Sequence, residues 1–255
     1  CMGRISHELV QVMPDERTVL MGDDFTNSGL FMFIADKPRD LSAGKLYVAK
    51  WHQVSGKGPG EGKLSWIKLG EANSDEIQRL VDAGIKSTDI MEIHTKDPKD
   101  ASFTKIGYSG KTNWVKLKPG MEKEAAFLET HRYAALVGAS LGFTKMEGTT
   151  VNIKDKKAYS AMSYIYKTMT DGSTDIHVEG PKAGAVYEHT LTGGQKDNHG
   201  HAIDSEWVSV HMVPPLNLIG EDLAVADELG NTAHADRISN PDNLKYSEKL
   251  RTLFI

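Results

Sequence analysis

Residues 7–24 have the sequence HELVQVMPDERTVLMGDD, and they contain two apolar runs, at 9–13 and 18–21. A Pro-Asp-Glu-Arg segment separates the runs, and this composition is typical of a tight turn. The pattern predicts a β-hairpin. Acidic residues lie at both ends of it, because Glu8 opens the first strand and Asp23 and Asp24 follow the second.

Short apolar runs separated by charged turns continue along the chain. Residues 30–34 and 46–51 predict a second strand pair, and 149–153 and 158–166 predict a third. Further strands are expected at 64–69, 184–191 and 207–213, and a last hairpin at 243–246 and 250–255. We therefore predict a mainly β fold, a partial β-propeller of about three blades, although a β-sandwich would give a similar pattern.

The stretch 73–142 has a different pattern, with apolar residues at helical spacing. Residues 74–83 predict a helix capped by Asn73 or Ser74, and 122–141 predict a longer helix that ends at Gly142. A further short helix is expected at 222–229. The interpretation is a single propeller-type domain over residues 1–255 with a helical insertion at about 73–142.

Composition narrows the classes of function. The chain has 255 residues and a formal net charge of −5, with no basic block, which argues against nucleic-acid binding. No apolar run approaches the roughly 18 residues of a membrane span. Cys1 is the single cysteine, so an intrachain disulfide is excluded. The chain starts without a signal peptide and stops in a predicted strand, so we expect it to be a piece of a longer protein.

Two segments begin like known motifs but lack a residue that the motif requires. His7-Glu8 begins like a zinc-protease helix, but Gln11 stands where that motif needs its second histidine. Residues 56–63 are rich in glycine and end in lysine, yet Leu64 follows where a P-loop needs Ser or Thr for magnesium. Both segments are better interpreted as structural, the first as a strand and the second as a flexible loop.

Two polar groups have plainer interpretations. His199 and His201 could bind a transition metal, but a mobile polar loop is the simpler explanation for them. Glu129, His131 and Arg132 do not share one face of the predicted helix 122–141. We therefore expect these three residues to form an exposed charged patch without a function.

The acidic residues at strand ends form a more informative set. Glu147 and Asp242 lie where later hairpins open, as Glu8, Asp23 and Asp24 do for the first. Carboxylates on the rims of several strands can converge when the sheets are arranged around an axis. Their oxygen atoms suit calcium, magnesium, manganese or ferric iron, so we expect a metal site on a β scaffold.

Five segments, in this order and spacing, carry a resemblance to a known family: residues 3–8 (GRISHE), 19–24 (VLMGDD), 44–49 (GKLYVA), 143–148 (FTKMEG) and 240–244 (NPDNL). They resemble the central part of PhoX-type alkaline phosphatases. The segment 143–148 is similar to the Arg-Pro-Glu segment of that family, and 240–244 to its Pro-Asp-Gly-Leu segment. The resemblance is weakest over 56–125 and 193–235.

The resemblance implies a calcium- and iron-dependent phosphomonoesterase on a β-propeller, usually exported to the periplasm or outside the cell. It implies Glu8 and Glu147 as metal ligands, followed by Asp23, Asp24 and Asp242, and small phosphate esters as substrates. Lys145 stands where the family usually has an arginine that binds the substrate phosphate. This replaces a bidentate fork with a point charge.

A second departure concerns iron. The iron-ligating cysteine of the family lies in an Asn-Cys segment well upstream of the His-Glu segment, whereas Cys1 lies only six residues before His7. We therefore do not assign Cys1 as a ligand. Two alternatives stay open from the residues: a metal-dependent propeller lactonase, and a non-catalytic propeller module that binds calcium. The oligomeric state is not predicted.

Overall fold

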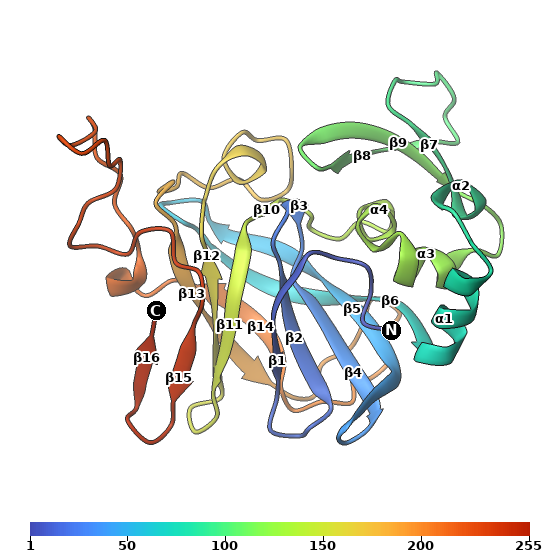
Figure 1. Cartoon of the computed structure of the whole chain (residues 1–255), viewed down its shortest axis with the longest axis horizontal. Helices are drawn as coiled ribbons and strands as arrows, with labels where there is room; N and C mark the ends of the chain where they lie inside the picture. The colour runs from blue at the N-terminus through green and yellow to red at the C-terminus, as the bar shows by residue number, and fades with distance from the viewer.

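Nine antiparallel strands form one sheet that dominates the computed structural model, which describes residues 1–255 (Figure 1). Their order is β1-β2-β4-β5-β6-β14-β13-β12-β11. The bounds are β1 His7–Val12, β2 Thr18–Asp23, β4 Phe31–Lys37, β5 Asp40–Ser55, β6 Glu61–Asn73, β11 Met146–Asn152, β12 Lys157–Met162, β13 Ala185–Thr192 and β14 Val208–Val213. The edge strands β1 and β11 lie side by side, so the sheet nearly closes into a barrel.

The central strands are buried on both faces. On β2 and β4, Leu20 and Met32 belong to a core inside the curved sheet, whereas Val19 and Phe31 belong to a second core on the outer face. Helices α3 (Glu122–Leu128) and α4 (Thr130–Leu136) cover the outer core. Burial on both faces explains why these strands appear in the sequence as continuous apolar runs.

The prediction of a mainly β protein is confirmed, and so are the hairpins at 9–21, 149–166 and 243–255. The strands that we grouped into blades belong to one continuous sheet, so a count of three blades is not confirmed. Two small pairs lie outside the large sheet: β3 (Thr26–Ser28) with β10 (Phe143–Thr144), and β15 (Lys245–Ser247) with β16 (Thr252–Phe254).

The insertion is not wholly helical, which corrects our prediction. It contains α1 (Ser74–Asp82) and α2 (Ser87–Ile90), and also a three-stranded sheet of β7 (Met91–His94), β9 (Lys111–Leu117) and β8 (Thr104–Tyr108). A two-residue turn joins β8 to β9, with Ser109 and Gly110 both at positive φ. A Ser-Gly pair in such a turn is a local hairpin signal, and the helical interpretation of this stretch overlooked it.

Two helix predictions also need correction. The predicted helix 122–141 is two helices, α3 and α4, because the backbone breaks at Glu129 with φ −125° and ψ 42°. No helix forms at 222–229, where Asp227 instead accepts backbone hydrogen bonds from Leu229 and Asn231. Short 3₁₀ turns lie at Lys167–Met169 and Leu216–Leu218. The cap at Asn73 is confirmed by a reciprocal pair of hydrogen bonds with Glu76.

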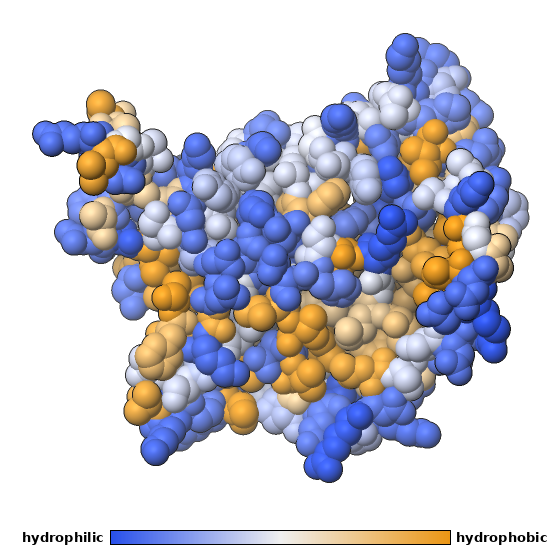
Figure 2. Space-filling model, in the orientation of Figure 1, coloured by the Kyte–Doolittle hydropathy of each residue, from blue (hydrophilic) through white to orange (hydrophobic).

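The surface on the side of β1 and β11 has two zones. Val10 and Val12 on β1 are exposed, and Figure 2 shows apolar surface across the middle of this face, beneath a band of hydrophilic residues and above a hydrophilic lower margin. The hydrophilic band lies over the upper ends of the strands in Figure 1. Among the helices, none combines the length and the apolar character needed to cross a membrane.

Candidate metal centre

Three carboxylates meet where the sheet nearly closes. Glu8 lies on β1, Asp24 directly follows β2, and Glu147 lies on β11; one ligand oxygen from each is within 4.8 Å of the other two. We call these residues the carboxylate cluster. Glu8 is exposed, Asp24 is half-buried, and Glu147 is buried at 4% exposure.

The strand register explains the convergence. β1 and β2 pair antiparallel with His7 opposite Asp23, so Glu8 and Asp24 lie at the same end of the hairpin. β11 approaches this hairpin closely at Gly22, where a Cβ atom would lie 2.8 Å from the carbonyl oxygen of Met146. Glycine therefore permits the approach of β2 and β11 that brings Glu147 to the cluster.

Lys145 is the cation of this site. Its backbone has φ 56°, in the left-handed region, and its ammonium contacts Asp24 and lies 3.0 Å from an oxygen of Glu147. Burial alone would lower the pKa of Lys145, but hydrogen bonds to Asp24 and Glu147 outweigh it and raise that pKa. Lys145 is therefore charged near neutral pH and offsets part of the negative charge of the cluster.

Glu147 has a perturbed acidity. Burial raises the pKa of Glu147, and repulsion by Asp24 and Asp242 raises it further, while the hydrogen bond from Lys145 acts in the opposite direction. A raised pKa is what we expect where carboxylates converge, although burial rather than repulsion is the largest cause. A cation bound here would favour the ionised form.

The other predicted ligands lie differently. Asp23 is fully buried, and its carboxylate accepts hydrogen bonds from the backbone of Ser6 and Gly29 and contacts His131 Nε2 at 2.8 Å. Successive residues of an extended chain point to opposite faces, so Asp23 leaves the cluster while Asp24 joins it. Asp242 is exposed at the rim, close enough to raise the pKa of Glu147.

The cysteine takes no part in this arrangement. The thiol of Cys1 lies 3.3 Å from the carbonyl oxygen of Ser42 and 3.6 Å from that of Leu41, at the start of β5. The residue packs against the outer core with other partly buried apolar side chains. The donors that converge are therefore carboxylate oxygens, a set suited to hard cations.

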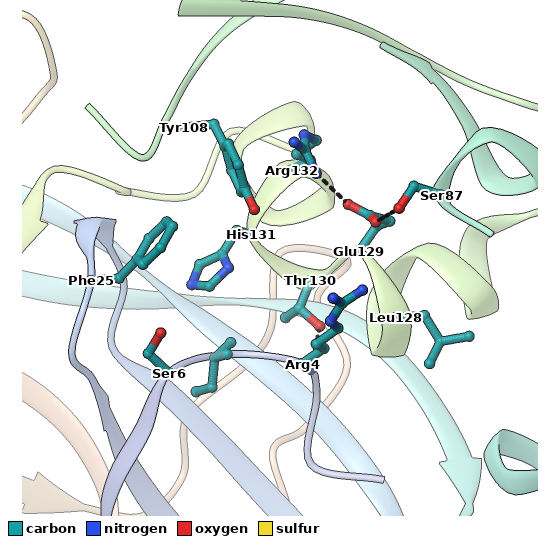
Figure 3. Close-up of a pocket in the computed structure, with 11 residues that line it drawn as sticks. Arg4, Ser6, Phe25, Ser87, Tyr108, Leu128, Glu129, Thr130, His131 and Arg132 are labelled. Carbon is teal, nitrogen blue, oxygen red and sulfur yellow. Dashed lines mark hydrogen bonds and ion pairs between the residues drawn. The ribbon is translucent and has the colours of Figure 1, made fainter. Parts of the chain in front are cut away.

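A pocket of about 250 Å³ lies between the N-terminal segment and α4, and Figure 3 shows its lining side chains. Segments far apart in sequence line it: Arg4, Ile5, Ser6, Phe25, Ser87, Tyr108, Leu128, Glu129, Thr130, His131 and Arg132. Ser6 lies two residues before Glu8 and Phe25 directly follows Asp24, so two of the segments that carry the cluster also line the pocket.

Our prediction of an exposed charged patch at Glu129, His131 and Arg132 is wrong. Glu129 is 7% exposed, and it accepts hydrogen bonds from Ser87 and, at 2.7 Å, from Arg132. His131 points to Asp23 instead. The break between α3 and α4 turns these neighbours toward the sheet, and a straight-helix interpretation of the sequence could not reveal that.

The comparisons with known proteins identify the family of this chain. The family model described as "Alkaline phosphatase PhoX" matches residues 1–249. A solved structure, Pseudomonas fluorescens PhoX in complex with vanadate, a transition state analogue, aligns over 99% of this chain with 19% identity and a TM-score of 0.53. This chain spans 38% of that protein's chain. No curated protein was found to match the sequence. The match of the family model over nearly the whole sequence shows that the chain belongs to the PhoX alkaline phosphatase family.

Proposed function

We propose that this chain provides cation-binding and phosphate-binding groups of a metal-dependent phosphomonoester hydrolase. The observation that carries the proposal is the convergence of Glu8, Asp24 and Glu147 from three strands, next to the ammonium of Lys145, in a member of the PhoX family. The proposed substrates are small phosphate esters, as the vanadate complex of the similar protein also suggests.

The proposed cations are calcium and iron. Glu8, Asp24 and Glu147 would hold them, with Asp242 as a further donor at the rim. All of these donors are carboxylates, which fits calcium and ferric iron. When bound, such cations polarise phosphoryl oxygens and lower the pKa of a coordinated water.

Lys145 would act on the substrate. Its ammonium contacts two members of the cluster, so a phosphate held there would lie within its reach. Lys145 would donate a hydrogen bond to a phosphate oxygen and stabilise the negative charge that grows during hydrolysis. Water attacks phosphorus, the bond from phosphorus to the ester oxygen breaks, and the alcohol leaves with a proton.

The proposal includes the location of the protein. The resemblance implies an exported protein, so we propose the periplasm or the outside of the cell. The net charge of −5 makes nucleic acid a poor partner.

The test combines metal content with activity in the full-length protein. We expect purified protein to contain calcium and iron and to hydrolyse p-nitrophenyl phosphate. Glu147→Gln should lose both metal and activity, whereas Asp97→Asn, an exposed carboxylate outside the cluster, should lose neither. Lactone hydrolysis with one divalent ion, or calcium without any turnover, would contradict the proposal and favour the lactonase or the binding module.

A further inference from the structure

The pocket beside the carboxylate cluster has the composition of a binding site for an organic group. One wall is aromatic. The rings of Phe25 and His131 stack with their centres 4.5 Å apart, and the centre of the Tyr108 ring lies 5.6 Å from that of Phe25. Figure 3 shows these three side chains together on one side of the pocket. Flat aromatic surfaces of this kind bind planar rings by stacking.

Most charges around the pocket are already satisfied within the protein. Arg132 pairs with Glu129 and also lies 3.7 Å from the centre of the Tyr108 ring. Ser87 donates to Glu129, and His131 pairs with Asp23. These groups hold one another in place, so they shape the pocket and leave little free charge in it.

Arg4 differs from the other charged residues of the pocket. Its backbone N–H donates to Thr130 Oγ1 at 2.8 Å, which fixes the segment against α4. Arg4 is exposed and lines the pocket, and it is not among the residues that form ion pairs in the structure. The pocket thus presents one free guanidinium, and a guanidinium binds a carboxylate or a phosphate with two parallel hydrogen bonds.

The pocket lies close to the carboxylate cluster, where the phosphate of a substrate would bind. Ser6 and Asp23 are joined by a hydrogen bond of 2.9 Å, and the backbone N–H of Asp24 donates to the carbonyl of Ser6 at the same distance. The backbone carbonyl of Phe25, which lines the pocket, accepts a hydrogen bond of 3.1 Å from the N–H of Lys145, so the pocket lies next to the segments that carry the cluster. A phosphate ester with its phosphate at the cluster would place its alcohol portion next to Phe25.

We propose that this pocket binds the leaving group of the ester, and that Arg4 selects leaving groups with a planar ring and a second anionic group. This inference rests on the proposed phosphatase function and names its substrate class. Phe25 and Tyr108 would contact the ring, and Arg4 would bind the second anion. The insertion supplies Tyr108 and α4, so it determines specificity in this chain.

Binding of a product-like probe tests the inference without requiring turnover. We expect 4-hydroxybenzoate to bind the full-length protein more tightly than phenol in ligand-observed NMR titrations. Arg4→Gln should weaken the binding of 4-hydroxybenzoate about fivefold, the scale of one exposed ion pair, and leave the affinity for phenol unchanged. Arg4→Lys should retain part of the preference for 4-hydroxybenzoate over phenol. Arg79→Gln, a matched exposed arginine on α1, should retain all of it. Equal binding of 4-hydroxybenzoate by wild type and Arg4→Gln would overturn the inference.

Kinetics separate this inference from the proposed function. The ratio of kcat/KM for 4-carboxyphenyl phosphate to that for phenyl phosphate should fall about fivefold in Arg4→Gln relative to wild type. An unchanged ratio in active enzymes would overturn the pocket assignment. If every protein is inactive but the binding difference persists, the phosphatase proposal fails and the anion-selective pocket stands.

Discussion

At the scale of single residues, Lys145 is the most informative position. It departs from the arginine that the resemblance implies, yet its ammonium reaches two members of the carboxylate cluster. An arginine would bind phosphate through two parallel bonds, whereas a lysine provides one compact charge. By this resemblance, Lys145 would keep the positive charge at the position of the arginine and give up its bidentate geometry.

We predict that Lys145→Ala lowers turnover of p-nitrophenyl phosphate by about 100-fold or more, on the order of 3 kcal/mol, because in the proposed mechanism the lost ammonium would stabilise the transition state. Metal content by mass spectrometry should stay near that of wild type, since the carboxylates remain. Lys154→Ala, an exposed lysine outside the cluster, is the control. Full activity of Lys145→Ala would show that the lysine is only a neighbour of the site.

A second residue, His189, makes stability depend on pH. It is fully buried between the hydroxyls of Ser160 and Ser209, and burial, with a smaller contribution from His211, lowers the pKa of His189 to about 3. In the unfolded chain its pKa is about 6.5. Between these values the unfolded state binds the additional proton, so stability decreases as the pH falls.

Because of His189, the free energy of unfolding measured in urea should decrease by about 1.4 kcal/mol for each pH unit below pH 6. The variant His189→Gln should be less stable at pH 7, and its free energy of unfolding should fall less steeply with pH than that of wild type. If the free energies of unfolding of the two proteins fell equally between pH 6 and pH 5, His189 would not be a buried neutral histidine.

At the scale of elements, the approach of β2 to β11 determines the site. β1 and β2 form a hairpin, but β11 comes from a distant part of the chain, and at Gly22 the backbones of β2 and β11 approach closely. The φ of Gly22 is not in the left-handed region, so the requirement for glycine here comes from space rather than from backbone conformation.

We predict that Gly22→Ala destabilises the protein by about 1–3 kcal/mol, because the added Cβ would contact the carbonyl oxygens of Met146 and Glu147 and push the strands apart. The separation should also weaken metal binding, since Glu147 would move with β11. Calcium titration and urea unfolding of the same variant measure the two effects. Wild-type affinity for calcium combined with lower stability would show that the cluster does not depend on this contact.

At the scale of the whole molecule, the carboxylate cluster lies where the first and last strands of the sheet meet. β1 and β11 are both edge strands, and the cluster joins β1, the end of β2 and β11. A cation bound there would connect the two edges and oppose the repulsion among three carboxylates. Metal binding would therefore stabilise the whole sheet as well as the site.

Removal of the metal should lower the melting temperature. For a cation at 100 times its dissociation constant, the stabilisation is about 2.7 kcal/mol, which corresponds to roughly 5–10 °C in a domain of this size. Scanning calorimetry with and without a chelator measures it, and calcium should restore the higher value. Glu147→Gln should show no such shift; a shift as large as that of wild type would place the stabilising ion elsewhere.

Local sequence patterns determined most of the strands. The alternation of apolar runs with short charged turns is a local signal, so the hairpins at 9–21 and 149–166 and the cap at Asn73 could be predicted from the residues alone. The acidic residues at strand ends also marked the candidate ligands. The Ser109–Gly110 turn shows that a further local signal was present in the insertion.

Tertiary structure alone decided which strands adjoin and which carboxylates meet. Pairing of β6 with β14 and the meeting of β1 with β11 depend on contacts between residues far apart in the chain, and no local pattern encodes them. The same holds for Asp23 and Asp24: the sequence marks both as candidates, but only the fold turns one toward His131 and the other toward Glu8 and Glu147. The physical reason is that a carboxylate's role depends on its neighbours in space, and those neighbours come from strands that the sequence does not order.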